Sequence, residues 1–177
     1  MKTRLVTPLL ALAFGVALAT SALAQDAPSP ADAGFPDLVA GLRAVPGNLG
    51  VETAHTANGK NVIFAWFEDK AALLRWYDSD MHREVQDRFF PDRPPHTPLA
   101  HVPDGTGPIL AVASITMADQ PQFEETTSLP ISQIAIELYT PLSGGLSLGG
   151  TFAPEGMEVP HMIQLGPYGE HEHPDER

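Results

Sequence analysis

Residues 49–67, LGVETAHTANGKNVIFAWF, hold the local signal that decides the fold. Two runs rich in β-branched and aromatic residues flank Asn58-Gly59, and Asn-Gly is the preferred centre of a tight hairpin turn. Residues 62–67 are apolar on both faces of the second expected strand. We therefore expect a hairpin whose second strand is covered on both sides or lies at a subunit interface.

Helical patterns flank this hairpin. Upstream, residues 35–44 favour a short helix that Pro46-Gly47 ends. Downstream, Asp69 is a good cap for a helix running to about Arg88, because apolar residues then recur at three- and four-residue steps.

Two further strands are expected after a long loop. Residues 91–108 contain six prolines and predict an irregular loop that is functional or wraps over a neighbouring element. Residues 109–117 are rich in β formers, and in 131–139 the alternation places Ile134, Ile136 and Leu138 inward. The order predicts an α+β sandwich, in which a four-stranded antiparallel sheet carries two helices on one face.

The N-terminus predicts export. Lys2 and Arg4 precede an apolar run that is too short to span a membrane, and residues 22–24 (ALA) fit a signal-peptidase site. Without a twin-arginine pair, a Sec-type signal cleaved after Ala24 is the simpler prediction. It places the mature protein in the periplasm or outside the cell, with no membrane anchor after cleavage.

The mature chain is acidic and has one domain's length. The full sequence carries 22 acidic against 10 basic residues, for a net charge of −12, and removal of Lys2 and Arg4 with the signal makes the mature chain more acidic still, which argues against nucleic-acid binding. The absence of cysteine means that packing, not disulfides, must stabilise the protein. We expect a flexible lead-in over 25–34, a domain over 35–153, and a poorly ordered acidic, His-containing tail over 154–177.

Residues 45–52 (VPGNLGVE) and 62–82 (VIFAWFEDKAALLRWYDSDMH) resemble the antibiotic-biosynthesis-monooxygenase (ABM) domains. Those domains share a P-G-x-x-G turn, a hairpin, a W-x-[DE] strand end, and a helix with tryptophan and histidine. The resemblance implies a ferredoxin-like fold, and a homodimer whose sheets pair into an α/β barrel.

The chain departs from the family in two ways. No strand precedes residue 35, so 109–117 or 131–139 would have to supply the missing one. Members that oxidise aromatic polyketides or cleave haem use an Asn–Trp–His set. Trp76 matches the tryptophan, but no first-strand asparagine is present, and Gln86 stands where the haem-cleaving members have histidine.

His82 and Asp78 are the candidate catalytic residues. They lie one helical turn apart, so the carboxylate would orient the imidazole as a general base and, with Asp80, raise its pKa. The alternative is a solvated surface pair, which forms readily on helices.

The candidate substrate-binding residues are Trp66, Trp76, His55, Glu137 and Tyr139. The tryptophans are either a ligand platform or core and interface aromatics. The other three would converge on a pocket if their strand faces point inward, and otherwise are structural polar groups. The remaining histidines lack an enforced metal-binding geometry, so neither a metal site nor a cofactor is predicted.

Two classes of function remain open. The first is an exported small-molecule-binding ABM-like domain, with cofactor-independent monooxygenation of a small apolar or aromatic compound as its activity. The second is a non-catalytic periplasmic dimerisation or protein-interaction module. A hollow beside the tryptophans favours the first, and a filled core favours the second.

The export prediction can be checked by mass. The protein recovered from the periplasm or medium should begin at Gln25, and Ala22→Arg should accumulate the precursor, because the peptidase requires small residues at its site. Intact mass spectrometry measures both, and an exported chain that retains residues 1–24 would contradict the assignment.

Overall fold

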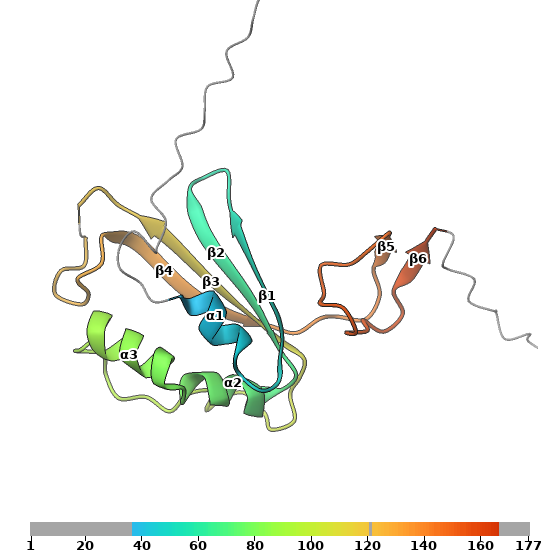
Figure 1. Ribbon diagram of the computed structural model, residues 1–177, viewed down its shortest axis with the longest axis horizontal. Helices are drawn as coiled ribbons and strands as arrows, with labels where there is room; N and C mark the ends of the chain where they lie inside the picture. The colour runs from blue at the N-terminus through green and yellow to red at the C-terminus, as the bar shows by residue number, and fades with distance from the viewer. Residues whose placement is uncertain (1–36, 121, 167–177) are drawn as a thin grey trace, which may run out of the picture.

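The computed structural model describes residues 37–120 and 122–166. The elements, in chain order, are α1 (Leu38–Arg43), β1 (Asn48–His55), β2 (Lys60–Phe67), α2 (Lys70–Tyr77), α3 (Asp80–Phe89), β3 (Ile109–Met117), β4 (Ile131–Tyr139), β5 (Leu146–Leu148) and β6 (Ile163–Leu165). β1 to β4 form one antiparallel sheet in chain order, and all three helices lie on one face of it (Figure 1). The predicted α+β sandwich is confirmed.

The predicted signal peptide and the lead-in over 25–34 lie outside the described residues. Within the described ranges, none of the helices combines the length and the apolar character that crossing a membrane requires.

The hairpin forms at the predicted turn. Gly59 has a φ of 82°, a conformation that glycine adopts without steric cost. The Thr56 side chain accepts a hydrogen bond from the Lys60 amide at 3.0 Å, which closes the turn. β3 then pairs with the other edge of β2, so β2 is an interior strand and β3 and β4 complete the sheet without a strand before α1.

The P-G-x-x-G turn holds α1, β1 and α2 together. Gly47 has a φ of 84°, and a Cβ there would lie 2.7 Å from the Cβ of Ala72 in α2. The Glu68 amide donates to the Gly47 carbonyl, and the Arg75 side chain donates to the Pro46 carbonyl, both at 2.9 Å. This turn therefore needs a glycine so that the backbone can approach the helix closely.

The helix expected to run to Arg88 is two helices. Asp69 caps α2 as predicted, accepting from the Ala72 amide at 2.7 Å. The chain leaves helical geometry at Ser79, whose ψ is 149° and whose hydroxyl accepts from the His82 amide at 3.2 Å. A serine stabilises a helix more as its N-cap than at an interior position, so the long helix breaks here and α3 starts in a new direction.

Two apolar clusters fill the space between helices and sheet. The first gathers around Phe67, which is 0% exposed, and includes Leu73, Trp76 and Ile109. The second lies towards the far end of α3 and consists of Val85, Phe89, Ile115, Leu129 and Ile131.

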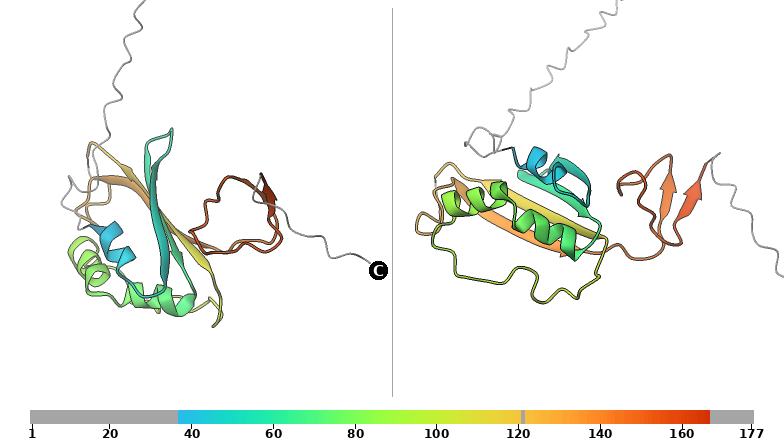
Figure 2. Two further views of the ribbon diagram at one scale, coloured as in Figure 1. Left: turned by 45° about the vertical axis from the view of Figure 1, so that its right-hand side comes forward. Right: turned by 60° about the horizontal axis from the view of Figure 1, so that its bottom comes forward.

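The proline-rich segment 91–108 contains no helix or strand, as predicted, and returns along the helix layer to the start of α2 (Figure 2). Leu99 and Val102 pack against the first apolar cluster. The Lys70 amide donates to the Thr106 carbonyl at 2.9 Å, and the Lys70 ammonium lies 2.8 Å from Asp104. The segment therefore wraps over its own domain.

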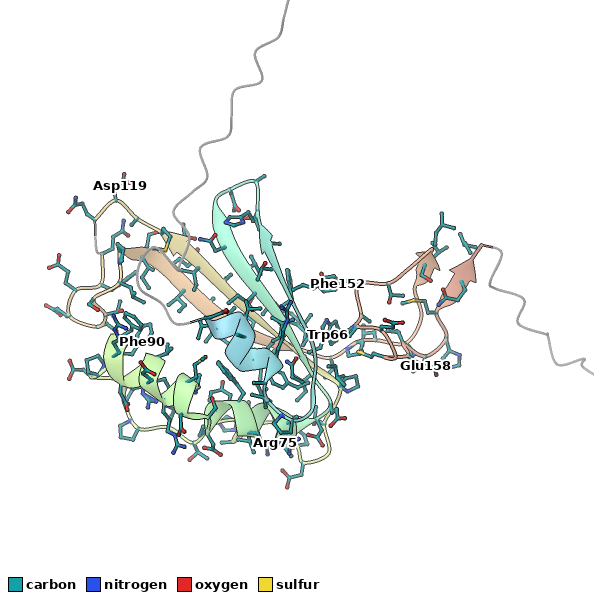
Figure 3. The ribbon with its side chains drawn as sticks, in the orientation of Figure 1. Trp66, Arg75, Phe90, Asp119, Phe152 and Glu158 are labelled. Carbon is teal, nitrogen blue, oxygen red and sulfur yellow. The ribbon has the colours of Figure 1, made fainter. Side chains whose placement is uncertain are left out.

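The outer face of β2 is covered by a residue from the C-terminal region. The ring of Phe152 lies 5.0 Å from that of Phe64 and 6.2 Å from that of Trp66, centroid to centroid (Figure 3). Val62 and Trp66 are both 6% exposed, so the prediction that β2 is covered on both faces is confirmed. Within the tail expected to begin at residue 154, β6 pairs in parallel with β5.

The central position of Phe67 generates a stability prediction. Phe67→Ala should lower the free energy of unfolding by about 3–5 kcal/mol, because it leaves a cavity in the first apolar cluster. Chemical denaturation measures this. Phe123→Ala, at a residue 47% exposed, is the matched control and should cost far less; equal losses would contradict the assigned core.

Candidate functional site

A cavity of about 410 Å³ lies between the helix layer and the sheet. Small side chains from β2 and β3 form its floor, because Ala65, Ala111 and Ala113 face the helices between the two apolar clusters. Sites for small molecules typically measure about 300–1,000 Å³, so the space suits a compact ligand. The full lining is Leu38, Leu42, Ile63, Ala65, Phe67, Leu73, Trp76, Tyr77, His82, Val85, Gln86, Phe90, Arg93, Ala111, Ala113, Ile115, Ile134, Ala135, Ile136 and Leu138.

The cavity reaches solvent along the edge strand β4. Ile134 and Ile136 line it and yet are 38% and 59% exposed. Lining residues that also meet water mark an opening, so a ligand has a path into the cavity beside β4. The buried side chains of Phe67 and Leu73 close the opposite end.

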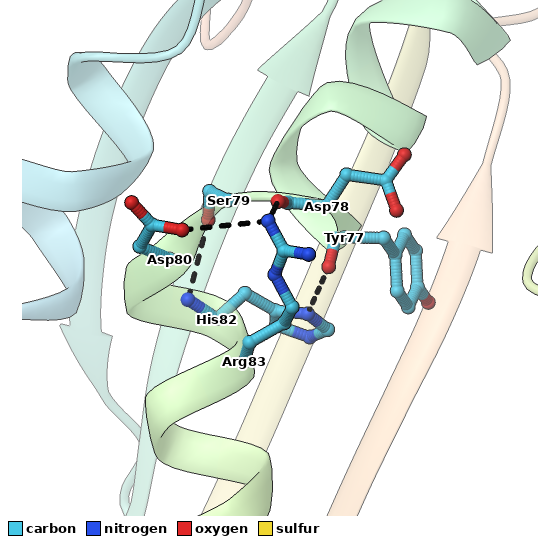
Figure 4. Close-up of polar contacts among 6 residues, drawn as sticks. All are labelled: Tyr77, Asp78, Ser79, Asp80, His82 and Arg83. Atoms are coloured by element: carbon cyan, nitrogen blue, oxygen red, sulfur yellow. Dashed lines mark hydrogen bonds and ion pairs between the residues drawn. The ribbon is translucent and has the colours of Figure 1, made fainter.

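His82 is the best-placed titratable residue of this lining. Its ring lies 5.2 Å from that of Trp76 and 4.8 Å from that of Tyr77, centroid to centroid. Its Nδ1 is 3.0 Å from the carbonyl oxygen of Tyr77, the last residue of α2 (Figure 4). Its Nε2 lies 3.4 Å from the side-chain nitrogen of Gln86, one turn along α3. The break at Ser79 creates this arrangement, because it brings the start of α3 back over the end of α2.

The hydrogen bond to Tyr77 fixes the protonation of the ring. A carbonyl oxygen only accepts, so Nδ1 carries the hydrogen and Nε2 of the neutral ring is the acceptor. Burial is the largest effect on His82 and lowers its pKa, and Arg93 and His96 lower it further, whereas the bond to Tyr77 and the charge of Asp78 act in the opposite sense. The ring is therefore neutral near pH 7, with an unprotonated Nε2.

The role predicted for Asp78 is not the one that the structure gives it. Asp78 is exposed and ends α2, and the backbone of Tyr77 orients the imidazole in its place. The prediction failed because it assumed an unbroken helix with Asp78 and His82 on one face. The expected rise in the pKa of His82 is wrong as well, since burial lowers this pKa by more than the charge of Asp78 raises it.

The predicted binding residues do not converge. Trp76 lines the cavity, but Trp66 lies on the opposite face of the sheet against Phe152 (Figure 3). Glu137 and Tyr139 are exposed on that outer face, where the Tyr139 hydroxyl donates to the Glu137 carboxylate at 3.0 Å and its pKa is raised by this bond.

His55 is exposed at the hairpin end of β1, at the opposite edge of the sheet from β4. The reason is strand alternation: β4 turns Ile134, Ile136 and Leu138 towards the helices, so Glu137 and Tyr139 must point away.

Sequence reasoning missed several lining residues. Phe90 and Arg93 come from the end of α3 and from the proline-rich segment, where no periodicity indicates a direction. The floor did leave a signal, because β3 places Ala111 and Ala113 between Ile109 and Ile115 on one face. Small residues in the middle of an otherwise bulky strand face indicate unfilled space.

No group of three or more His, Asp or Glu side chains within residues 37–120 and 122–166 could hold a metal ion.

Residues 31–88 match the family model described as antibiotic biosynthesis monooxygenase. The matched segment spans α1, β1, β2, α2 and most of α3, and it confirms the resemblance inferred from the sequence. Neither the search of curated proteins nor that of solved structures gave a match.

The environment of His82 predicts how stability depends on pH. Since burial lowers its pKa, the unfolded chain takes up a proton near the ordinary value of 6.5 and the folded chain only at lower pH. The stabilisation is therefore complete above 6.5 and is lost as pH falls from there towards the folded-state pKa.

Wild type should thus lose more free energy of unfolding than His82→Gln between about pH 7.5 and about pH 5, as measured by denaturant titration. His55→Gln, at an exposed position, is the matched control and should behave like wild type. An NMR titration that places the pKa of His82 at or above 6.5 would contradict the buried, neutral ring.

Proposed function

We propose, on the premise that residues 31–88 form an antibiotic biosynthesis monooxygenase segment, that this protein binds a small apolar or aromatic molecule in the cavity between its sheet and its helices. The observation that carries the proposal is the hollow itself. A space of about 410 Å³ with an almost wholly apolar lining lies directly beside Trp76 and His82.

The same hollow weighs against a purely scaffolding role. In a non-catalytic dimerisation or interaction module, nothing prevents the space between helices and sheet from being filled with Phe and Leu. Here alanines occupy the middle of β2 and β3 at that point. An unfilled cavity of this size costs stability, and a binding function explains why it is present.

The chemistry that the site could perform is proton abstraction followed by oxygenation. The neutral Nε2 of His82 would take a proton from an acidified CH₂ group, and the resulting carbanion would give electrons to O₂. The balanced reaction, R₂CH₂ + O₂ → R₂C=O + H₂O, needs no external reductant, because the substrate carbon supplies all four electrons. We therefore propose cofactor-independent monooxygenation as the activity of this site.

The proposal includes export and a homodimer. The acidic chain would act in the periplasm or outside the cell after cleavage at Ala24. Two copies would pair through the part of the outer sheet face that Phe152 leaves uncovered, where Tyr139 is 49% exposed.

The two tryptophans of the chain provide an internal test of where the ligand binds. Fluorescence titration of the purified protein with naphthalene-2-carboxamide should show quenching that Trp76→Phe abolishes and Trp66→Phe preserves, because only Trp76 lines the cavity.

Ala113→Phe, which fills the floor, should weaken binding at least about tenfold, whereas Ala71→Phe on the exposed side of α2 should leave it unchanged. Binding that survives in Ala113→Phe, or quenching that follows Trp66, would refute the cavity as the site.

A further inference from the structure

The charged part of the cavity lining is entirely cationic. Among the lining residues, which all belong to the described ranges, Arg93 and His82 can carry positive charge and none is aspartate or glutamate. This contrasts with the chain as a whole, whose net charge is −12. Because its lining lacks carboxylates, this cavity favours anions over cations although the protein as a whole is acidic.

Arg93 lies at the rim of the cavity. It lines both the cavity and a shallow polar groove formed with Asp87, Pro94 and His96, and its side chain is 35% exposed. Its nearest acid is Asp87, at 3.9 Å and 79% exposed, which is beyond hydrogen-bonding distance. No hydrogen bond from the guanidinium is found within residues 37–120 and 122–166, so its donors can serve a ligand.

Neutral donors lie on the same side of the cavity. Gln86 carries an amide next to His82, and burial raises the pKa of the Tyr77 hydroxyl, which therefore stays protonated. The far side, formed by Ala111, Ala113 and Leu73, is apolar. The cavity is thus divided into an apolar floor and a rim of donors with one permanent positive charge.

We infer that the ligand is an amphipathic anion, with an apolar ring system over Ala111 and Ala113 and one carboxylate or phenolate oxygen group held by Arg93. This inference rests on the proposed function and specifies its ligand class. The guanidinium presents paired N–H donors that match a carboxylate, and such charge-assisted bonds are stronger than neutral ones.

Three probes that share one ring system test the inference: 2-naphthoate, naphthalene-2-carboxamide and 2-naphthylmethylammonium. Wild-type protein, followed by Trp76 fluorescence, should bind the carboxylate at least about tenfold more tightly than the amide, and the ammonium most weakly. Arg93→Gln should reduce the affinity for the carboxylate to that for the amide and leave the amide unaffected.

Two further variants serve as controls. Arg88→Gln removes the same charge from an exposed position outside the lining and should leave the preference for the carboxylate in place. Asp87→Asn removes the acid nearest to Arg93 and should strengthen carboxylate binding.

Equal binding of all three probes, or a preference for the carboxylate that survives in Arg93→Gln, would overturn the anionic ligand while leaving the cavity as a binding site. Failure of all three to bind would overturn the proposed function and this inference together.

Discussion

The structure depends on the burial of β2 from both sides. One face of this strand carries Ile63, Ala65 and Phe67 into the space under the helices, and the other carries Val62, Phe64 and Trp66. A strand with six consecutive apolar side chains cannot leave either face in water without a large hydrophobic cost. The helix layer covers the first face, and Phe152 reaches back from the C-terminal region over the second. The cavity exists because the helix layer does not fill the space above Ala65, Ala111 and Ala113.

Much of the fold follows from local rules in the sequence. Asn58-Gly59 specified the hairpin, a stretch rich in β formers located β3, and period-two alternation located β4, both at their observed bounds. Two features could not be predicted from local patterns. Ser79 fits the polar positions of an amphipathic helix, but it stabilises the structure more as the N-cap of α3, so the helix breaks there. The contact of Phe152 with β2 joins distant parts of the chain, and no periodic pattern in the sequence predicts it.

The site was harder to predict than the fold. Trp76 could be selected from the family resemblance and His82 from its spacing to Asp78, and both line the cavity. The pairing of His82 with Asp78 was a spacing argument, and it failed as soon as the helix was interrupted. Arg93 lies in a proline-rich segment without regular structure, so only the tertiary path of that segment could reveal its position. Local pattern thus identified the chemical groups, while the direction of each side chain required the packed structure.

The lining of the cavity is drawn from two unequal sources. The family match ends at residue 88, whereas Arg93, Ala111, Ala113 and the isoleucines of β4 all come after it. The matched part supplies the imidazole, the indole and part of the floor, and the unmatched part supplies the rest of the floor, the rim charge and the opening. In the proposed function, the reactive imidazole and the charged rim are therefore encoded in separate stretches of the chain. Substitutions after residue 88 could redirect the protein to a different compound while the His82–Trp76 pair stays as it is.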